Sequence, residues 1–482
     1  MAPVSKRSLY KSDSQPKMDS SNYKVSPNPR TIEALNSTKA KDFSNVFDTY
    51  DMDYIENLVR ELHTEDPLSI QICVENINSL YIRIPHIFFL NAGLIQGLVH
   101  AIKIIESPRS KTVVFNLLAS ISSLDLGNDY GLCDESFLGV AYESLRKFIP
   151  ERSESLILLF NNLLAEESLR YPLTRAMFQT KFHEIIMDLI NDLEMRLHED
   201  DSSFNKKTKK DARKLQIEVQ KLIYRYMESI ERENYYEMLF ILDYSLVCLE
   251  SQFEKVRFGA TEIFLIAFQE SIILDMYMEK GFYEILMKTI RMSGSESIHS
   301  VFNCLTYIYN HKPDTVVIDK SLLNICIHHA SSSSPVDIES VFDFLITITP
   351  DYADFIMSEG ILDTFMADMF YEQFFAKKKI IMFSMRFFEY ALNTEGLCGQ
   401  IVRIYDCLVE IFPTLNNEEI IDILDCINIQ INKNINYIHA LSNSNQMRDI
   451  IHDLANHENH KISIIAINII KYITEFFDSS TL

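Results

Sequence analysis

The residues that most resemble catalytic or metal-binding groups lie in two short clusters that contain histidine. These clusters are "CIHHA" and "NHENH", and they hold Cys326, His328, His329, His457, Glu458 and His460. A metal site needs several ligands that converge on one point, whereas adjacent helical residues point in different directions. The sequence also has no GxGxxG, phosphate-loop, HExxH or GxSxG motif. We therefore predict a protein that is not an enzyme and that uses no metal or other cofactor.

A second pattern is a polar residue that returns in the middle of an apolar helix signature. The stretches "SVFNCLTYI" at residues 300–308 and "SVFDFLITI" at residues 340–348 share this signature. The equivalent position recurs at Asn78, Asn116, Asn161, Arg225, Leu265, Asn303, Asp343, Ser384, Asp425 and Asn468. Successive positions lie roughly forty residues apart, as in helical repeat proteins, except where a charged insertion at about 194–214 lengthens one interval. The pattern predicts about ten repeated units.

The elements that carry these residues are expected to be helices. The chain has 482 residues, is 47% apolar and contains only 11 Gly and 13 Pro, a composition that favours helix. A helical repeat of about 40 to 47 residues is typical of armadillo and HEAT solenoids. Gly93, Gly281 and Gly360 each precede an amphipathic stretch, where a left-handed residue can turn one helix sharply into the next. We predict an all-α solenoid over residues 46–482.

The order of short helix, Gly, apolar helix and long helix resembles the repeat of the armadillo superfamily, which includes importin-alpha and beta-catenin. The resemblance covers roughly residues 50–477. It implies a right-handed superhelix of three-helix repeats, of armadillo or HEAT type, whose third helices line a concave groove. Within the superfamily, a basic tail ahead of about ten repeats is similar to the importin-alpha nuclear-import adaptors. The chain departs from those adaptors because it has no Trp and offers only "SKR" at residues 5–7 in place of a dense Arg cluster.

Helical phase predicts which way the polar residues point. At about 100 degrees per residue, Asn303 lies opposite the apolar side of its helix and shares its face with Tyr307. In the groove that the resemblance implies, such residues would contact the main chain of an extended peptide, because an Asn amide both donates and accepts. The predicted peptide-binding residues are Asn78, Asn116, Ser120, Asn161, Asn303, Tyr307, Asp343, Thr347, Asp425, Asn468 and Tyr472. The alternative is that exposed helix positions are simply polar.

Charge bears on the class of partner. The chain has 68 acidic and 45 basic residues and a net charge of -23, which argues against direct nucleic-acid binding because phosphate contacts need a basic surface. Residues 1–45 are by contrast basic and Ser-rich, and we predict that they form a disordered tail. An acidic body favours basic partners. We therefore expect a scaffold or adaptor that binds extended, basic peptide segments, or alternatively an importin-alpha-like adaptor that reads nuclear localisation signals.

The cellular setting follows from cysteine usage and hydropathy. Eight Cys without a CxxC pair, and an N-terminus without an apolar signal segment, predict an intracellular protein. No apolar run approaches the ~20 residues that a membrane span needs. We expect a cytoplasmic location, with shuttling to the nucleus under the import alternative. The sequence does not fix the oligomeric state, for which a monomer is the simplest expectation.

Overall fold

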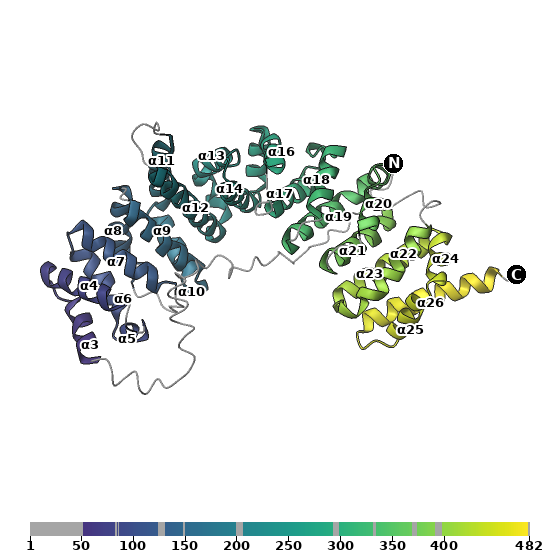
Figure 1. The fold of residues 1–482 in the computed structure, drawn as a ribbon, viewed down its shortest axis with the longest axis horizontal. Helices are drawn as coiled ribbons and strands as arrows, with labels where there is room; N and C mark the ends of the chain where they lie inside the picture. Colours follow the sequence, from purple (N-terminus) through teal and green to yellow (C-terminus); the bar gives the residue numbers. More distant parts are fainter. Residues whose placement is uncertain are drawn as a thin grey trace. The chain divides into compact units, whose positions relative to one another are not determined.

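The computed structural model describes residues 52–81, 84, 86–123, 131–147, 150–198, 206–292, 298–330, 334–368, 374–390 and 398–480. Within these ranges the chain is helical and contains no strand (Figure 1). The all-α prediction is therefore confirmed for the described residues. The predicted basic tail at 1–45 lies outside them.

The helices fall into two compact units, Met1–Ser245 and Leu246–Leu482. The first unit holds α3 (Met52–Glu61), α4 (Pro67–Tyr81), α5 (His86–Asn91), α6 (Leu94–Ile104), α7 (Pro108–Ile121), α8 (Glu135–Arg146), α9 (Pro150–Ala165), α10 (Glu167–Gln179), α11 (Phe182–His198), α12 (Lys206–Ser229) and the 3-10 turn η2 (Arg232–Met238). Helix α13 (Leu239–Cys248) spans the division between the units.

The second unit continues the same helical pattern. It holds α14 (Glu254–Ala267), α15 (Ser271–Glu279), α16 (Phe282–Met292), α17 (Ile298–His311), η3 (Pro313–Thr315), α18 (Lys320–Ala330), α19 (Pro335–Ser358), α20 (Ile361–Asp368), α21 (Phe374–Tyr390), α22 (Cys398–Ile411), η4 (Phe412–Thr414), α23 (Asn417–Lys433), α24 (Ile435–Asn443), α25 (Asn445–Leu454) and α26 (His460–Ser480).

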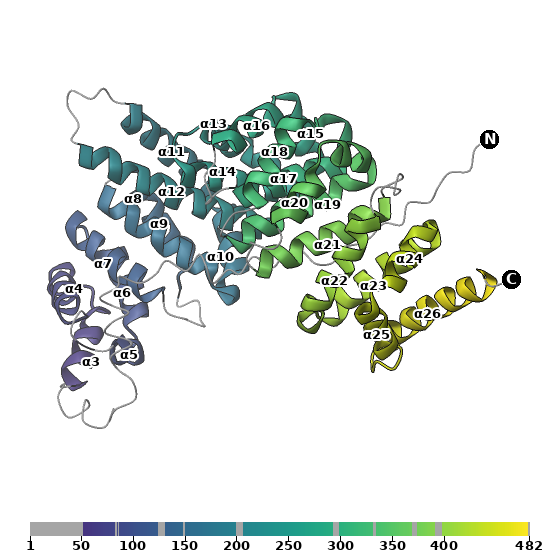
Figure 2. The ribbon, with the colours of Figure 1, turned by 45° about the vertical axis from the view of Figure 1, so that its right-hand side comes forward.

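The long helix of each repeat packs against the long helix of the next. In the first unit α4 packs on α7, α7 on α9, and α9 on α12, and Figure 2 shows α8, α9, α11 and α12 side by side. In the second unit the same order runs through α14, α17, α19, α21, α23 and α26. We call these ten helices the third-helix row. Each of them carries one position of the pattern seen in the sequence.

The predicted left-handed glycines are present. Gly93, Gly281 and Gly360 have φ of 84°, 83° and 69°, and each stands directly before the second helix of its repeat, α6, α16 or α20. At the same place before α11 the chain has Lys181, with φ 57°. Sequence reasoning missed this junction because it searched for Gly, whereas Lys181 adopts the same turn at a steric cost.

Helix α19 consists of two helical segments that join at a kink beside a proline. Pro350 lies inside this helix, and Tyr352 just after it has a non-helical φ of -123° and ψ of 16°. Proline removes one backbone hydrogen bond and crowds the preceding turn, which favours a kink. The part of α19 before the kink belongs to the third-helix row, and the part after it leads into α20.

Aromatic side chains fill the space inside a repeat. Four aromatic side chains are fully buried: Phe264 of α14, Phe268 just after that helix, Tyr277 of α15 and Phe282 of α16. Their rings pack with centroid distances that begin at 4.6 Å, between Phe264 and Phe282. Because neighbouring repeats touch through the third-helix row, the core is continuous along each unit.

The region predicted as a charged insertion is largely helical. Helix α11 ends at His198 and α12 begins at Lys206, so most of 194–214 extends these two helices. Helix α12 has 24 residues and starts within the "KKTKK" run. In the described residues of this region, the longer spacing corresponds to longer helices.

Candidate functional site

Four of the predicted residues lie open on the third-helix row of the second unit. Asp343 on α19 and Asn468 on α26 are exposed, whereas Asn303 on α17 and Asp425 on α23 are half-buried. Their side chains make no hydrogen bond to the described part of the chain, so their polar atoms remain available to a ligand. Asn303, Asp343 and Asp425 occur on three different helices of the row, spread along it rather than gathered at one point.

The first unit is different, because two of its predicted residues, Asn116 and Asn161, make hydrogen bonds to neighbouring helices. The Asn116 amide oxygen accepts a hydrogen bond from the Ser155 hydroxyl on the next helix of the row. Asn161 is fully buried, and its Nδ2 donates to the Glu218 carbonyl oxygen at 3.0 Å. The prediction that Asn161 faces a groove is therefore wrong. The long helix α12 packs over it, which a phase argument on one helix does not take into account. Asn78 is half-buried.

The residues four positions later also differ from the prediction. The hydroxyls of Ser120 and Thr347 donate to the carbonyl oxygens of Asn116 and Asp343 in their own helices, at 2.9 and 2.7 Å. Such bonds are common for Ser and Thr within helices and leave the hydroxyl hydrogen engaged. The two hydroxyls therefore lack a free donor hydrogen for a ligand.

The two predicted tyrosines have opposite environments. The Tyr307 hydroxyl donates to the Phe268 carbonyl oxygen at 2.6 Å, and its ring stacks on His311 with 4.2 Å between centroids. This bond ties α17 to the residue that follows α14, the preceding helix of the row, and peptide binding by Tyr307 stays a prediction. Tyr472 is 37% exposed on α26.

One repeat has its polar position in a different register. Ser384 on α21 is fully buried and bonds to the Ile380 carbonyl oxygen in its own helix. The half-buried positions of this helix include Lys379, Met382 and Arg386. The outward position of this repeat is therefore Met382, two residues before the one that the sequence pattern selected.

Helix α21 brings positive charge to this part of the row. Lys379 pairs with Glu339 at 2.5 Å and Lys378 with Glu419 at 2.7 Å. Arg386 lies 3.7 Å from Asp422 on α23. These ion pairs join α19, α21 and α23 and neutralise part of the acidic surface beside Asp343 and Asp425.

The carboxyls of Asp343 and Asp425 nevertheless form no ion pair within the described residues. Loss of water around the Asp343 carboxyl raises its pKa above the ordinary value, and Glu339 adds to this while Lys379 opposes it. Burial likewise raises the pKa of Asp425, against the effect of Lys461. A raised pKa means that the folded protein disfavours the ionised carboxylate. An additional cation at either position would relieve this.

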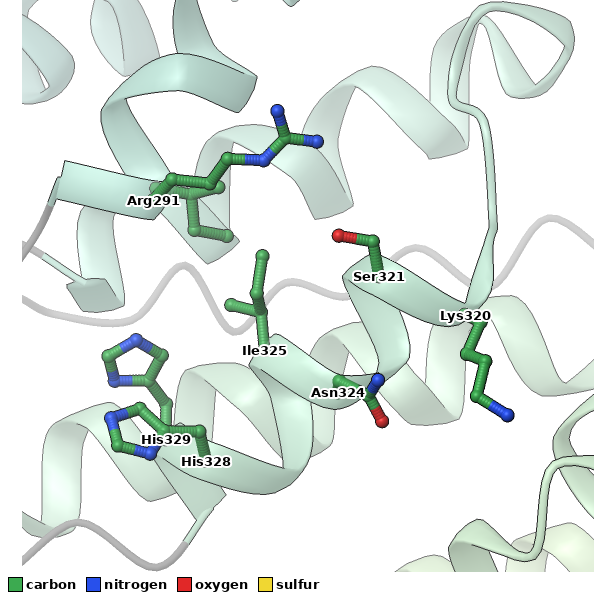
Figure 3. A pocket seen from close by; sticks show the side chains of 8 residues that line it. Arg291, Lys320, Ser321, Asn324, Ile325, His328 and His329 are labelled. Atoms are coloured by element: carbon green, nitrogen blue, oxygen red, sulfur yellow. The ribbon is translucent and has the colours of Figure 1, made fainter.

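An open recess lies between α16 and α18 in the second unit. It has a volume of about 630 Å³ and is lined in part by Arg291, Lys320, Ser321, His328 and His329. Figure 3 shows Ser321 and Ile325 rising from α18 toward α16, with the Arg291 guanidinium above them and the two imidazoles at the other end.

The chemistry of this recess is limited. Lys320 is already paired with Glu359 at 2.8 Å, and burial lowers the pKa of His329. The Cys326 thiol of the same helix is fully buried, which raises its pKa and disfavours the nucleophilic thiolate. Ser321 makes no hydrogen bond to a base in the described residues. The recess therefore does not assemble a nucleophile and base.

The second histidine cluster lies at the turn between α25 and α26. The ring nitrogen Nδ1 of His457 accepts a hydrogen bond from the Asn459 backbone N–H at 3.0 Å. In the part of the chain that the structure describes, no three His, Cys, Asp or Glu side chains gather so as to hold a metal ion. Over the same residues, no helix has the length and apolar character needed to cross a bilayer.

Comparison with known proteins supports the fold. No protein-family model matches the sequence, and no curated protein is similar enough to be matched. Among solved structures, the chain is similar to the crystal structure of an engineered protein from the Northeast Structural Genomics Consortium, with 13% sequence identity and a TM-score of 0.60. The match covers 88% of this chain and 99% of the engineered one. At this identity the likeness concerns the fold alone, and it identifies an all-helical, repeat-like architecture.

Proposed function

We propose that the chain is a non-enzymatic scaffold with armadillo-type repeats that binds an extended peptide along the third-helix row of its second unit. The observation that carries the proposal is the placement of Asn303, Asp343 and Asp425. They occupy equivalent positions on helices of the row and have no hydrogen-bond partner in the described residues. A catalytic site would gather such groups in one pocket, whereas these are distributed along the row.

The spacing of the row suits an extended chain. Packed helices lie about 8–10 Å apart, and an extended peptide advances about 3.3 Å per residue. One repeat therefore corresponds to about three peptide residues. The segment from Asn303 to Asp425 crosses three intervals between helices of the row, which suits a peptide of roughly nine residues.

Two kinds of contact would hold this peptide. The Asn303 amide can donate to and accept from the peptide main chain, a bond that contributes about 1 kcal/mol. Asp343 and Asp425 would pair with Lys or Arg side chains, whose hydrogen bonds to a carboxylate contribute about 1.5–3 kcal/mol each. These three contacts sum to about 4–7 kcal/mol, against the roughly 8 kcal/mol of micromolar affinity, so further contacts along the peptide must contribute.

Peptide display tests the proposal without a known partner. The full chain is used to select from a library of random twelve-residue peptides, and p-benzoylphenylalanine is then placed at Thr347, one turn after Asp343 on α19. We expect the selected peptides to carry Lys or Arg about six residues apart, because Asp343 and Asp425 are two helix intervals apart, and to cross-link from position 347. Asp354, an exposed carboxylate in the part of α19 beyond the kink, serves as the control position. Selected peptides without basic residues, or equal cross-linking from positions 347 and 354, would contradict the proposal.

A further inference from the structure

The recess between α16 and α18 has side chains that suit an anion at each of its two ends. Its volume of about 630 Å³ falls in the range that small-molecule sites commonly have. Among the described residues that line it, none is acidic, although the chain as a whole carries a net charge of -23. The lining therefore differs in charge from the molecule around it and favours a negatively charged ligand.

One end of the recess is formed by Arg291 and Ser321. Arg291 lies in the last turn of α16 and is exposed, and it forms no ion pair or hydrogen bond within the described part of the chain. Figure 3 shows its guanidinium above Ser321, an exposed residue near the start of α18. A guanidinium offers two parallel N–H donors that match the two oxygens of a carboxylate. Lys320 is not available at this end because it pairs with Glu359.

The other end of the recess is formed by His328 and His329 in the last turn of α18. Their rings lie edge to face with 4.9 Å between centroids, and neither ring has a hydrogen-bond partner in the ranges that the structure describes. A neutral imidazole has one N–H donor and a protonated one has two. Asp337 of α19 interacts electrostatically with His329, but its carboxyl lies 3.5 Å from a ring nitrogen of His299. The N–H groups of this end therefore remain available to a second carboxylate.

Apolar side chains separate the two ends. Ser321, Ile325 and His328 follow one another at steps of four and three residues on α18, so they share one face of the helix. From Ser321 to His328 this face extends about 10 Å. Ile325 lies between them, and Ile290 of α16 also lines the recess. A single carboxylate is too small to contact both ends, whereas a molecule with a carboxylate at each end of an apolar chain contacts both.

We infer that the recess binds a small, elongated dicarboxylate, with one carboxylate at Arg291 and the other at the two imidazoles. Its hydrocarbon chain would lie along Ile290 and Ile325, where removal of apolar surface from water is favourable. The main chain of an acidic peptide would instead bring N–H and C=O groups to these isoleucines, and polar groups buried without a partner cost free energy. The inference does not depend on the peptide proposal, because α16 and α18 are not helices of the third-helix row.

Saturation-transfer NMR on the full chain tests the inference with three carboxylates. Suberate has a carboxylate at each end of its chain, and octanoate has a chain of the same length with only one. Succinate has two carboxylates that are too close together to reach both ends of the recess. We expect suberate to bind saturably and at least about tenfold more tightly than either of the others, which each lose a charged hydrogen bond. Absence of saturable binding of suberate, equal affinity for octanoate, or tighter binding of an acetylated Glu-Ala-Ala-Glu peptide would overturn the inference.

Two matched double variants locate the binding. Arg291→Gln with His328→Gln removes one group from each end of the recess and should weaken suberate binding at least about tenfold. The control, Arg109→Gln with His452→Gln, changes an arginine of α7 and a histidine of α25 and should bind suberate like the wild type. All four residues are exposed, so both variants should keep the helical circular dichroism of the wild type. Suberate binding that survives the recess variant, or that falls equally in the control, would place the ligand elsewhere and overturn the inference.

Discussion

Asparagine serves two purposes at equivalent positions of two repeats, one in each unit. Asn161 is buried and holds α9 to the backbone of α12 through its bond to Glu218. Asn303 makes no hydrogen bond within the described residues and remains half-buried at the surface. The same side chain therefore supports the fold in one unit and is available to a ligand in the other, and what decides between the two roles is whether a neighbouring helix covers it.

Replacement of these two residues should separate the roles. Asn161→Ala should lower the free energy of unfolding by about 1–2 kcal/mol, because the Glu218 carbonyl loses a buried donor and a small cavity remains. Asn303→Ala should change it by less than about 0.5 kcal/mol. Urea denaturation followed by circular dichroism measures both. Equal losses of stability would mean that Asn303 also has a structural role.

At the scale of the residue, the periodicity of one helix could predict which side chains are exposed. It could not predict which residues of other helices those side chains contact. It placed Asn116, Asp343 and Asn468 on an outward side, where the structure also has them exposed. It missed the burial of Asn161 by α12 and the bond from Tyr307 to the Phe268 carbonyl oxygen. Both depend on residues about forty or more positions away, and the periodicity of one helix holds no information about them.

At the scale of elements, the repeat depends on a left-handed residue that reverses direction before its second helix. Gly occupies this place at Gly93, Gly281 and Gly360, and Lys181 occupies it before α11. The sequence could predict the first three because only Gly takes this conformation without a steric cost. The fourth could be found only by aligning "TKFHEI" with "KGFYEI" at the repeat spacing.

Substitutions at two of these junctions should act in opposite directions. Gly360→Ala should destabilise the chain by about 1 kcal/mol through the left-handed φ alone, since a Cβ there would meet no atom within 4 Å. Lys181→Gly should stabilise it by about 0.5 kcal/mol, as relief of the strained φ outweighs the added flexibility of Gly. Thermal and urea unfolding of the two variants check both signs. A stable Gly360→Ala variant would show that this turn does not need Gly.

At the scale of the whole molecule, the forty-residue period identified every helix of the third-helix row. Local pattern sufficed for this because each repeat packs mainly on its neighbours. The division into two units at Ser245 and Leu246 was not predicted. The register of α21 was misplaced by two residues because "FSMR" offers Ser384 as a polar position, although it is buried.

The central claim is that the polar residues of the third-helix row bind peptide. Isothermal titration with a peptide selected by display tests it most directly, using two matched variants of the full chain. The row variant replaces Asn303, Asp343 and Asp425 by Ala. The control variant replaces Asn324, Asp354 and Asp453, three exposed residues outside the row, by Ala and removes the same charge. We expect the row variant to remain folded and to bind at least about tenfold more weakly, the loss of one or two charged hydrogen bonds, while the control binds like the wild type. Equal affinity of the two variants would contradict the account.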